Sequence, residues 1–180
     1  METTEEKVEA PPMEAETKGS KIFVTDPSRF GELEESGYGT REEKGLFLRD
    51  YEALYLLHTK KLLLKESEKV VSFEELAEET QRRASDLWTK FIIYRDLRSR
   101  GYVVKEGFGF GTDLRVYERG DYPKKAAKYV VFALDEGIER RVDDLQTSVK
   151  EMARMGKEAI VAVIERRGEV IYYKVNRARF

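Results

Sequence analysis

The stretch Phe108–Phe132, FGFGTDLRVYERGDYPKKAAKYVVF, predicts two β-strands joined by a basic loop that contains one proline. In the first strand Leu114 and Val116 alternate with Arg115 and Tyr117, so that apolar and polar side chains fall on opposite faces. The second strand begins at KYVVF, an apolar run rich in β-branched and aromatic residues. The stretch therefore indicates a half-buried sheet whose polar face ends in a tyrosine.

Working outward, the C-terminal half alternates strands with one helix, and the N-terminal half is mostly helical. Strands are expected over 21–25, 102–107, 113–118, 128–134, 158–165 and 169–175, the last two joined by a hairpin turn at Gly168. Helices are expected over 50–64, 72–83, 86–100 and 143–155. The second of these begins with SFEE, a capping box formed by Ser72 and Glu75. The fold class is α+β (mixed α/β).

Composition shifts divide the chain into three parts. Residues 1–20 carry no periodicity and are expected to form a disordered tail. Residues 21–86 form a small N-terminal domain of helices and strand, with a Gly-rich basic loop near 37–45 inside a long irregular segment, 28–49. Residues 87–180 form a C-terminal nuclease-like domain with a mixed sheet flanked by helices.

The charge balance also differs between the two halves. The chain has a net charge of −2, but residues 1–87 carry 13 Lys/Arg against 21 Asp/Glu, and residues 88–180 carry 20 against 14. A basic half of this kind points to an anionic partner. The chain lacks cysteine, which excludes disulfides and thiolate sites. No apolar run is long enough to span a membrane, so a cytoplasmic protein is expected.

Several ordered motifs resemble one known family. FGTDLRVY, the strand KYVVF and the late helix-to-strand step MGKEAIVAVI look like the C-terminal catalytic domain of the archaeal tRNA-splicing endonucleases. The resemblance runs from about Tyr51 to the C-terminus. It implies metal-independent, cofactor-free cleavage of pre-tRNA introns at bulge–helix–bulge motifs. In that chemistry the RNA 2′-hydroxyl attacks, leaving a 2′,3′-cyclic phosphate and a 5′-hydroxyl.

The resemblance also assigns roles to particular residues. Tyr117 matches the general base, and Lys157 matches the cation that stabilises the phosphorane. Because a tyrosine with a pKa near 10 is a poor base at neutral pH, nearby cations such as Arg115 and Lys157 are needed to favour its phenolate. Without the resemblance, Tyr117 reads as a half-buried residue at a strand end.

The expected catalytic histidine is replaced by Ala126, which has no proton to give. The chain's single histidine, His58, lies within a predicted helix and is interpreted as structural. Ala126 is either an engineered inactivating change or the mark of a naturally inactive subunit. Retention of both Tyr117 and Lys157 favours the first of these.

Further positions are expected to contact RNA through charge or base stacking. On the predicted helix, Lys150 and Arg154 share a face with Lys157. The predicted RNA contacts are Arg41, Lys44, Arg115, Lys124, Lys125, Lys150, Arg154 and Tyr172. Core packing is an equally good interpretation of Tyr172, and a subunit-contact role is an alternative for the 37–45 loop. No His/Asp/Glu cluster has metal-ligand spacing.

The resemblance implies a two-fold symmetric assembly. The turn before the last strand, ERRG at 165–168, is not acidic as in many self-assembling members. A second, non-catalytic subunit in a two-plus-two heterotetramer is therefore expected. Two alternatives stay open: a non-catalytic architectural subunit of such a complex, and a generic RNA-binding module without cleavage.

Overall fold

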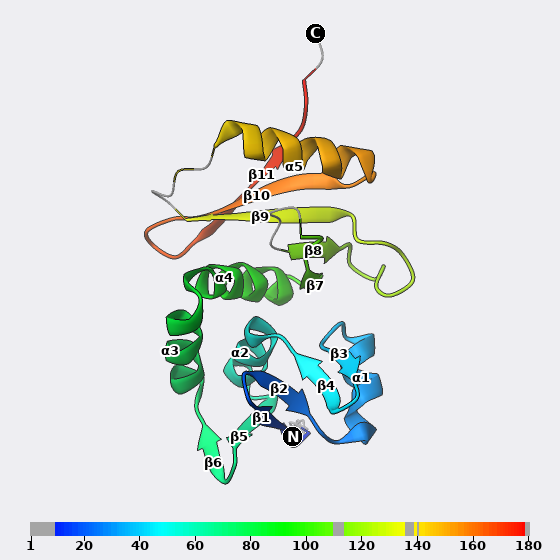
Figure 1. Cartoon of the computed structure of the whole chain (residues 1–180). Coiled ribbons are helices and arrows are strands. Elements are labelled where there is room, and N and C mark those ends of the chain that lie inside the picture. Colours follow the sequence, from blue (N-terminus) through cyan, green and yellow to red (C-terminus); the bar gives the residue numbers. More distant parts are fainter. Residues whose placement is uncertain (1–9, 110–113, 136–138, 140, 179–180) are drawn as a thin grey trace, which may run out of the picture.

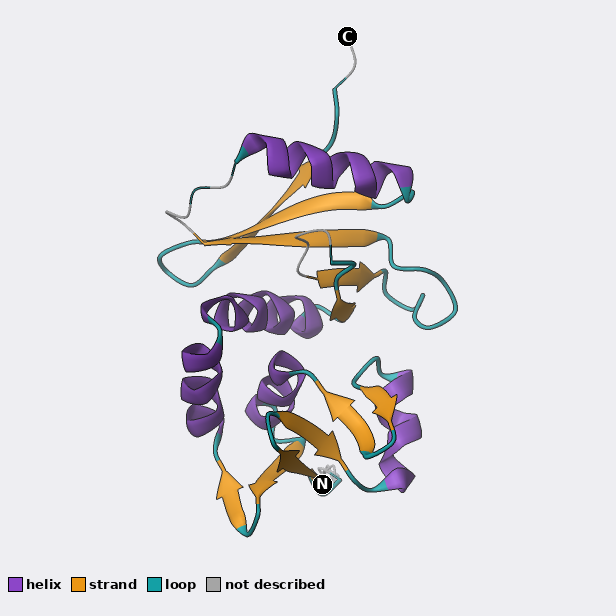
Figure 2. Cartoon of the chain, in the orientation of Figure 1, coloured by secondary structure: helices purple, strands orange, loops and turns teal. Residues whose placement is uncertain are grey.

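The computed structural model describes residues 10–109, 114–135, 139 and 141–178, and these form two β-sheets with helices between and outside them (Figures 1 and 2). From top to bottom in Figure 1, helix α5 covers the C-terminal sheet, α4 lies beneath that sheet, and the N-terminal sheet lies below α4. The predicted α+β class is confirmed. Among the described residues, no helix combines the length and apolar character that a membrane crossing requires.

The N-terminal sheet has the strand order β3-β4-β2-β1-β5-β6. Only β1 and β5 run parallel, and the other neighbours are antiparallel. In the sequence, two helices lie between its strands and a third follows the last strand. The elements are β1 Met13–Lys18, β2 Lys21–Val24, a 3-10 turn Pro27–Arg29, α1 Phe30–Glu35, β3 Thr40–Glu42, β4 Gly45–Leu48, α2 Asp50–His58, β5 Leu62–Glu66, β6 Lys69–Val71 and α3 Phe73–Arg83.

The C-terminal sheet has the order β11-β10-β9-β8-β7, with β9 and β10 parallel and all other pairs antiparallel. Its parallel pair is connected through α5, which crosses one face of the sheet (Figure 1). The elements are β7 Val103–Glu106, β8 Leu114–Tyr117, β9 Tyr129–Asp135, α5 Val142–Arg154, β10 Glu158–Ile164 and β11 Val170–Val175.

Helix α4, Ser85–Ser99, fills the space between the two sheets. Phe91, Ile93 and Tyr94 on this helix are fully buried, although they point in different directions around its axis. A helix covered on several sides needs apolar residues on several sides. One continuous hydrophobic core therefore runs from Ile22 in the first sheet to Ala162 in the second.

A buried carboxylate joins the N-terminal domain to β7. Glu52 is 2% exposed, and its side chain accepts hydrogen bonds from the backbone N–H of Arg49 at 2.8 Å and of Gly39 at 3.1 Å. Lys105 Nζ lies 3.8 Å from this carboxylate and donates to the Gly39 carbonyl at 2.7 Å. Burial raises the pKa of Glu52, and Lys105 and the two amides oppose that rise. This cluster fixes the turn before β3 against the second sheet.

Three expectations about the N-terminal half are wrong. The segment 28–49 is not a long loop, because it contains α1 and the β3–β4 hairpin. The helix expected over 50–64 ends at His58, and the apolar run that follows is strand β5. Within the expected disordered tail, residues 13–18 form strand β1, while residues 1–9 lie outside the described part of the chain.

The capping box at Ser72 is confirmed. Glu75 N–H donates to Ser72 Oγ at 3.2 Å, and Ser72 N–H donates to Glu75 Oε2 at 2.9 Å. Glu52 holds the same position in α2 relative to its N-cap residue, Arg49, but it is buried and Glu75 is exposed. The two glutamates thus form a matched pair that differs mainly in burial.

We predict that Glu52→Ala lowers the free energy of unfolding by about 3–5 kcal/mol, because it leaves the Lys105 ammonium without its buried counter-charge and two backbone amides without their acceptor. Glu75→Ala, in which water can replace the lost carboxylate, should cost clearly less. Urea denaturation of both variants measures the difference. Equal losses would contradict the role assigned to Glu52.

Candidate functional site

The edge of the C-terminal sheet where β8 ends and β9 and β10 begin brings together three predicted positions. Lys128 N–H donates to the Val116 carbonyl at 3.0 Å, and Glu158 N–H donates to the Lys128 carbonyl at 2.9 Å. These two bonds place Tyr117 beside the 126–128 segment and place Lys157 on its other side. Positions separated by 40 residues of sequence thus meet at one edge.

Lys157 is held in place by a backbone contact and an aromatic ring. Its ammonium donates to the Ala127 carbonyl and lies 6.0 Å from the centre of the Phe108 ring. The Arg115 guanidinium lies 5.4 Å from the same ring. Attraction between cations and the ring face helps to hold two positive charges at one place despite their mutual repulsion. The Arg115 Nε atom is buried and has no hydrogen-bond partner among the described residues.

Strand register shows which face of the sheet these side chains occupy. Arg115 pairs with Val130, and Val130 pairs with Ala159. Val130 and Ala159 pack with Met152 of α5, so this row of residues lies on the α5 face. Tyr117, two residues after Arg115, projects to the same face. The tyrosine and both cations therefore share one face of the sheet.

A groove with a volume of about 680 Å³ extends this face between α5 and the end of β11. Lys150, Arg154 and Lys157 all line it, although α5 ends at Arg154 and Lys157 follows the helix instead of continuing it. Two further cations, Lys174 and Arg177, line the same groove. The arrangement offers several positive charges to an extended anion.

The loop between β8 and β9 carries the remaining predicted positions of this region. Lys124, Lys125 and Ala126 are exposed, and Lys125 Nζ forms an ion pair with Asp121 at 2.8 Å. The methyl group of Ala126 offers neither a hydrogen-bond donor nor an acceptor. In the same loop the ring of Tyr122 meets the ring of Tyr117 edge-on, with centroids 4.9 Å apart and an interplanar angle of 82°.

The other predicted RNA contacts lie elsewhere. Arg41 and Lys44 belong to the β3–β4 hairpin of the other sheet, where Arg41 Nε donates to Glu34 at 3.0 Å (Figure 1). Tyr172 pairs with Ala162, which belongs to the core on the α4 face, opposite the groove. Its hydroxyl donates to Asp96 of α4 at 2.7 Å, and its pKa is raised by burial and by that bond.

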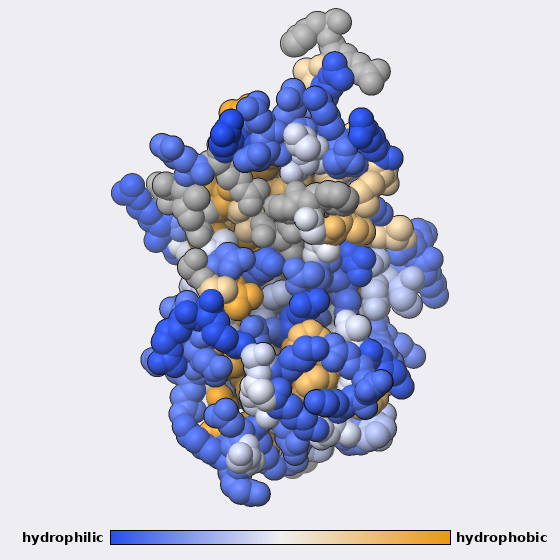
Figure 3. All heavy atoms as spheres, in the orientation of Figure 1, coloured by the Kyte–Doolittle hydropathy of each residue, from blue (hydrophilic) through white to orange (hydrophobic). Residues whose placement is uncertain are grey.

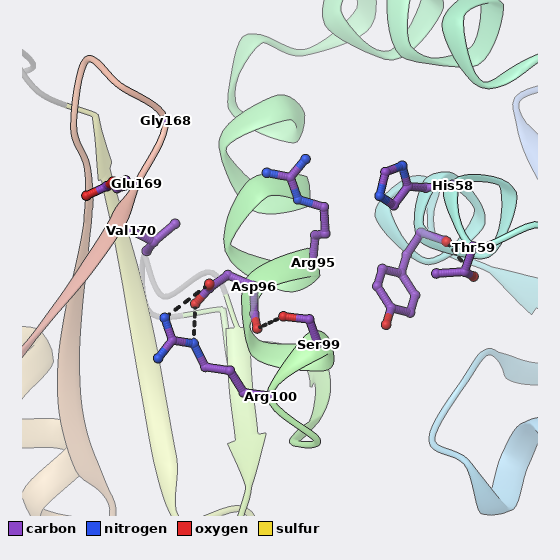
Figure 4. A pocket seen from close by; sticks show the side chains of 10 residues that line it. His58, Thr59, Arg95, Asp96, Ser99, Arg100, Gly168, Glu169 and Val170 are labelled. Atoms are coloured by element: carbon purple, nitrogen blue, oxygen red, sulfur yellow. Dashed lines mark hydrogen bonds and ion pairs between the residues drawn. The ribbon is translucent and has the colours of Figure 1, made fainter.

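His58 lies away from this edge. Its ring packs against Phe73 at a centroid distance of 5.8 Å, in agreement with the structural role expected for it. It also lines a cavity of about 520 Å³ between α2, α4 and the β10–β11 turn (Figure 4). That turn, with Gly168, is at the opposite end of β10 from Lys157. His58 therefore cannot replace an imidazole at position 126.

Sequence reasoning missed two aromatic residues of the site, Phe108 and Tyr122. Phe108 follows β7 in a Gly-rich run, and nothing in that run predicts that Arg115 and Lys157 both lie near its ring. Tyr122 precedes the loop proline, and its contact with Tyr117 depends on how the loop folds back. No group of three or more His, Cys, Asp or Glu side chains in the described ranges is arranged to hold a metal ion.

Surface character agrees with a polar ligand rather than an apolar one. The face shown in Figure 3 is mostly hydrophilic, with hydrophobic side chains visible only in small areas. Together, the fold and the site describe a class of protein: a two-sheet α+β protein with a tyrosine and lysine at a cationic sheet edge.

Comparison with known families and proteins identifies the family. Residues 13–77 match the model of the tRNA intron endonuclease N-terminal domain, and residues 87–172 match that of the tRNA intron endonuclease catalytic C-terminal domain. The chain belongs to the tRNA intron endonuclease family.

Individual relatives agree with this assignment. The tRNA-splicing endonuclease of Methanococcus vannielii is 34% identical over 107 residues, which are 59% of this chain and 60% of the relative. That of Thermococcus gammatolerans is 33% identical over 115 residues, 64% of this chain and 67% of the relative. The chain spans about three fifths of the length of the first of these relatives.

We predict that Tyr172→Phe lowers the free energy of unfolding by about 1 kcal/mol, because a half-buried hydrogen bond to Asp96 is lost. Since Tyr172 lies on the α4 face, the change should leave RNA affinity unaltered. Thermal unfolding and filter binding with an intron-containing pre-tRNA test both statements. Loss of RNA binding with unchanged stability would restore Tyr172 as a base-stacking residue.

Proposed function

We propose that this chain is a catalytic-type subunit of a tRNA-splicing endonuclease that cuts pre-tRNA introns at bulge–helix–bulge motifs. The observation that carries the proposal is the meeting of Tyr117 and Lys157 at one cationic sheet edge in a chain of this family. Both residues are the types that metal-independent RNA cleavage uses, and both lie on the face that holds the groove.

The proposed reaction follows from the chemistry of these groups. Tyr117, as phenolate, takes the proton of the RNA 2′-hydroxyl, and the 2′-oxygen attacks the phosphorus. Lys157 stabilises the negative charge that develops on a non-bridging oxygen. Arg115, held at the same ring as Lys157, adds a second positive charge at this sheet edge. The products are a 2′,3′-cyclic phosphate and a 5′-hydroxyl.

Position 126 lacks the imidazole that the family's chemistry uses as acid. Because a general acid contributes about 10²–10⁴-fold to the rate, the chain should cleave slowly as it stands. A second candidate function rests on this same residue: a non-catalytic subunit that positions RNA or a partner enzyme. Under either function we propose a two-plus-two assembly with a second type of subunit.

We predict that Ala126→His accelerates cleavage of an intron-containing pre-tRNA in EDTA, with 2′,3′-cyclic phosphate ends. In that background, Lys157→Ala should lower the single-turnover rate by roughly 10²–10³-fold, as loss of an oxyanion donor does. Lys65→Ala, which removes a lysine paired with Glu14 in the other sheet, is the matched control. Inactivity of the Ala126→His chain, alone and with a partner subunit, would favour the non-catalytic function.

RNA binding has a separate prediction. Lys150→Ala and Arg154→Ala should each weaken pre-tRNA binding and reduce the slope of log affinity against log salt by about one. Titration at several salt concentrations measures this slope. Lys65→Ala should leave it unchanged, and a slope that is equal in all three variants would remove the groove from the RNA path.

A further inference from the structure

The loop between β8 and β9 folds back on itself in a way that fixes one phenol against another. Asp121 N–H donates to the Glu118 carbonyl at 3.0 Å, and Lys125 N–H donates to the Asp121 carbonyl at 2.8 Å. The Lys125 side chain closes the same turn through its ion pair with Asp121. Tyr122 lies inside this turn, and its half-buried ring rests against Tyr117.

Two other ionisable side chains of the loop, Glu118 and Lys125, already form ion pairs. Glu118 is bound by the Lys128 ammonium, and its pKa is held below its usual range by that contact. Lys125 is paired with Asp121. Neither Tyr117 nor Tyr122 has a hydrogen bond from its hydroxyl to any described residue.

We infer that Tyr122 is the general acid of this site and gives its phenolic proton to the leaving 5′-oxygen in place of the absent histidine. The inference rests on the proposed function, because it concerns the same cleavage. Its basis is geometric: Tyr122 is the proton donor that the fold places next to Tyr117, in the loop that also contains Ala126.

The protonation states agree with this division of roles. Burial and the neighbouring Tyr117 both raise the pKa of Tyr122, so Tyr122 keeps its proton near neutral pH. When two like groups interact, ionisation of one opposes ionisation of the other. A phenolate at Tyr117 thus strengthens the hold of Tyr122 on its proton until the leaving group takes it.

The proton balance of the step closes. The 2′-hydroxyl proton passes to the Tyr117 phenolate while the bond between the 2′-oxygen and phosphorus forms. The bond between phosphorus and the 5′-oxygen breaks, and the 5′-oxygen takes the proton of Tyr122. The enzyme is left with a neutral Tyr117 and a Tyr122 phenolate, and exchange with water restores the starting state.

The test uses two forms of one intron-containing pre-tRNA, with either oxygen or sulfur as the bridging 5′-atom at the cleavage site. A thiolate leaves without protonation, so a variant that lacks only the general acid should still cleave the sulfur form. In the chain as it stands, Tyr122→Phe should slow single-turnover cleavage of the oxygen form by about 10²-fold. The sulfur form should be cleaved at nearly the original rate.

Two further variants complete the design. Tyr173→Phe removes a half-exposed phenol from β11 and is expected to change neither rate. In the Ala126→His chain, Tyr122→Phe should cost much less on the oxygen form, because the imidazole supplies the proton.

Each contrary outcome has a definite meaning. Equal slowing of both substrates would make Tyr122 a positioning residue and overturn the inference. So would unchanged cleavage of the oxygen form. If the chain cleaves neither form but Ala126→His cleaves the oxygen form, the proposed function stands and the inference fails. If no variant cleaves either form, both fail.

Discussion

The parallel pairing of β9 with β10 is the constraint from which the arrangement of the C-terminal half follows. Parallel neighbours cannot be joined by a tight turn, so the chain must cross one face of the sheet, and it does so through α5. The same pairing puts the starts of β9 and β10 at one edge. Because β8 runs antiparallel to β9, its end reaches that edge too. Tyr117, Ala126 and Lys157 are neighbours for this reason.

Helix α4 supplies the second constraint, because it is the shared core of both halves. Its residues Phe91 and Tyr94 are fully buried between the two sheets. They cover the apolar faces that the sheets turn toward each other. The polar cluster around Glu52 lies beside this core. Its hydrogen bonds have fixed directions and partners, which apolar packing does not require. Lys105 reaches from β7 to the Gly39 carbonyl, so a single strand is tied to the turn before β3. Gly39 has φ of 70°, a conformation that favours glycine at this turn.

The parts of the fold that could be predicted are those whose signal is local. Alternation gave β8, and the capping box gave the start of α3. The run 62–64 is predicted as helix because Leu62 falls in helical register with Tyr51, Leu54 and Tyr55, and pairing with β1 makes it a strand instead. Strand β4 has no clear sequence signal, because it is short and its flanking residues are charged and Gly-rich. Tyr172 was ambiguous because alternation shows that a residue faces one side without showing what covers that side. Contacts of Phe108 and Tyr122 are tertiary and leave no local pattern.

With alanine at position 126, the proposed mechanism assigns both proton transfers to phenols. An imidazole can donate or accept a proton near neutral pH, whereas two phenols must be driven into different states to do so. In the proposed mechanism this difference comes from adjacency, because a phenolate at Tyr117 would oppose ionisation of Tyr122. The proposed division into a base and an acid needs no difference in residue type. Burial of Tyr122 acts in the same direction, since it penalises the charged form of the residue that must stay neutral. In this proposal the β8–β9 loop decides which phenol keeps its proton, because it holds the Tyr122 ring against Tyr117.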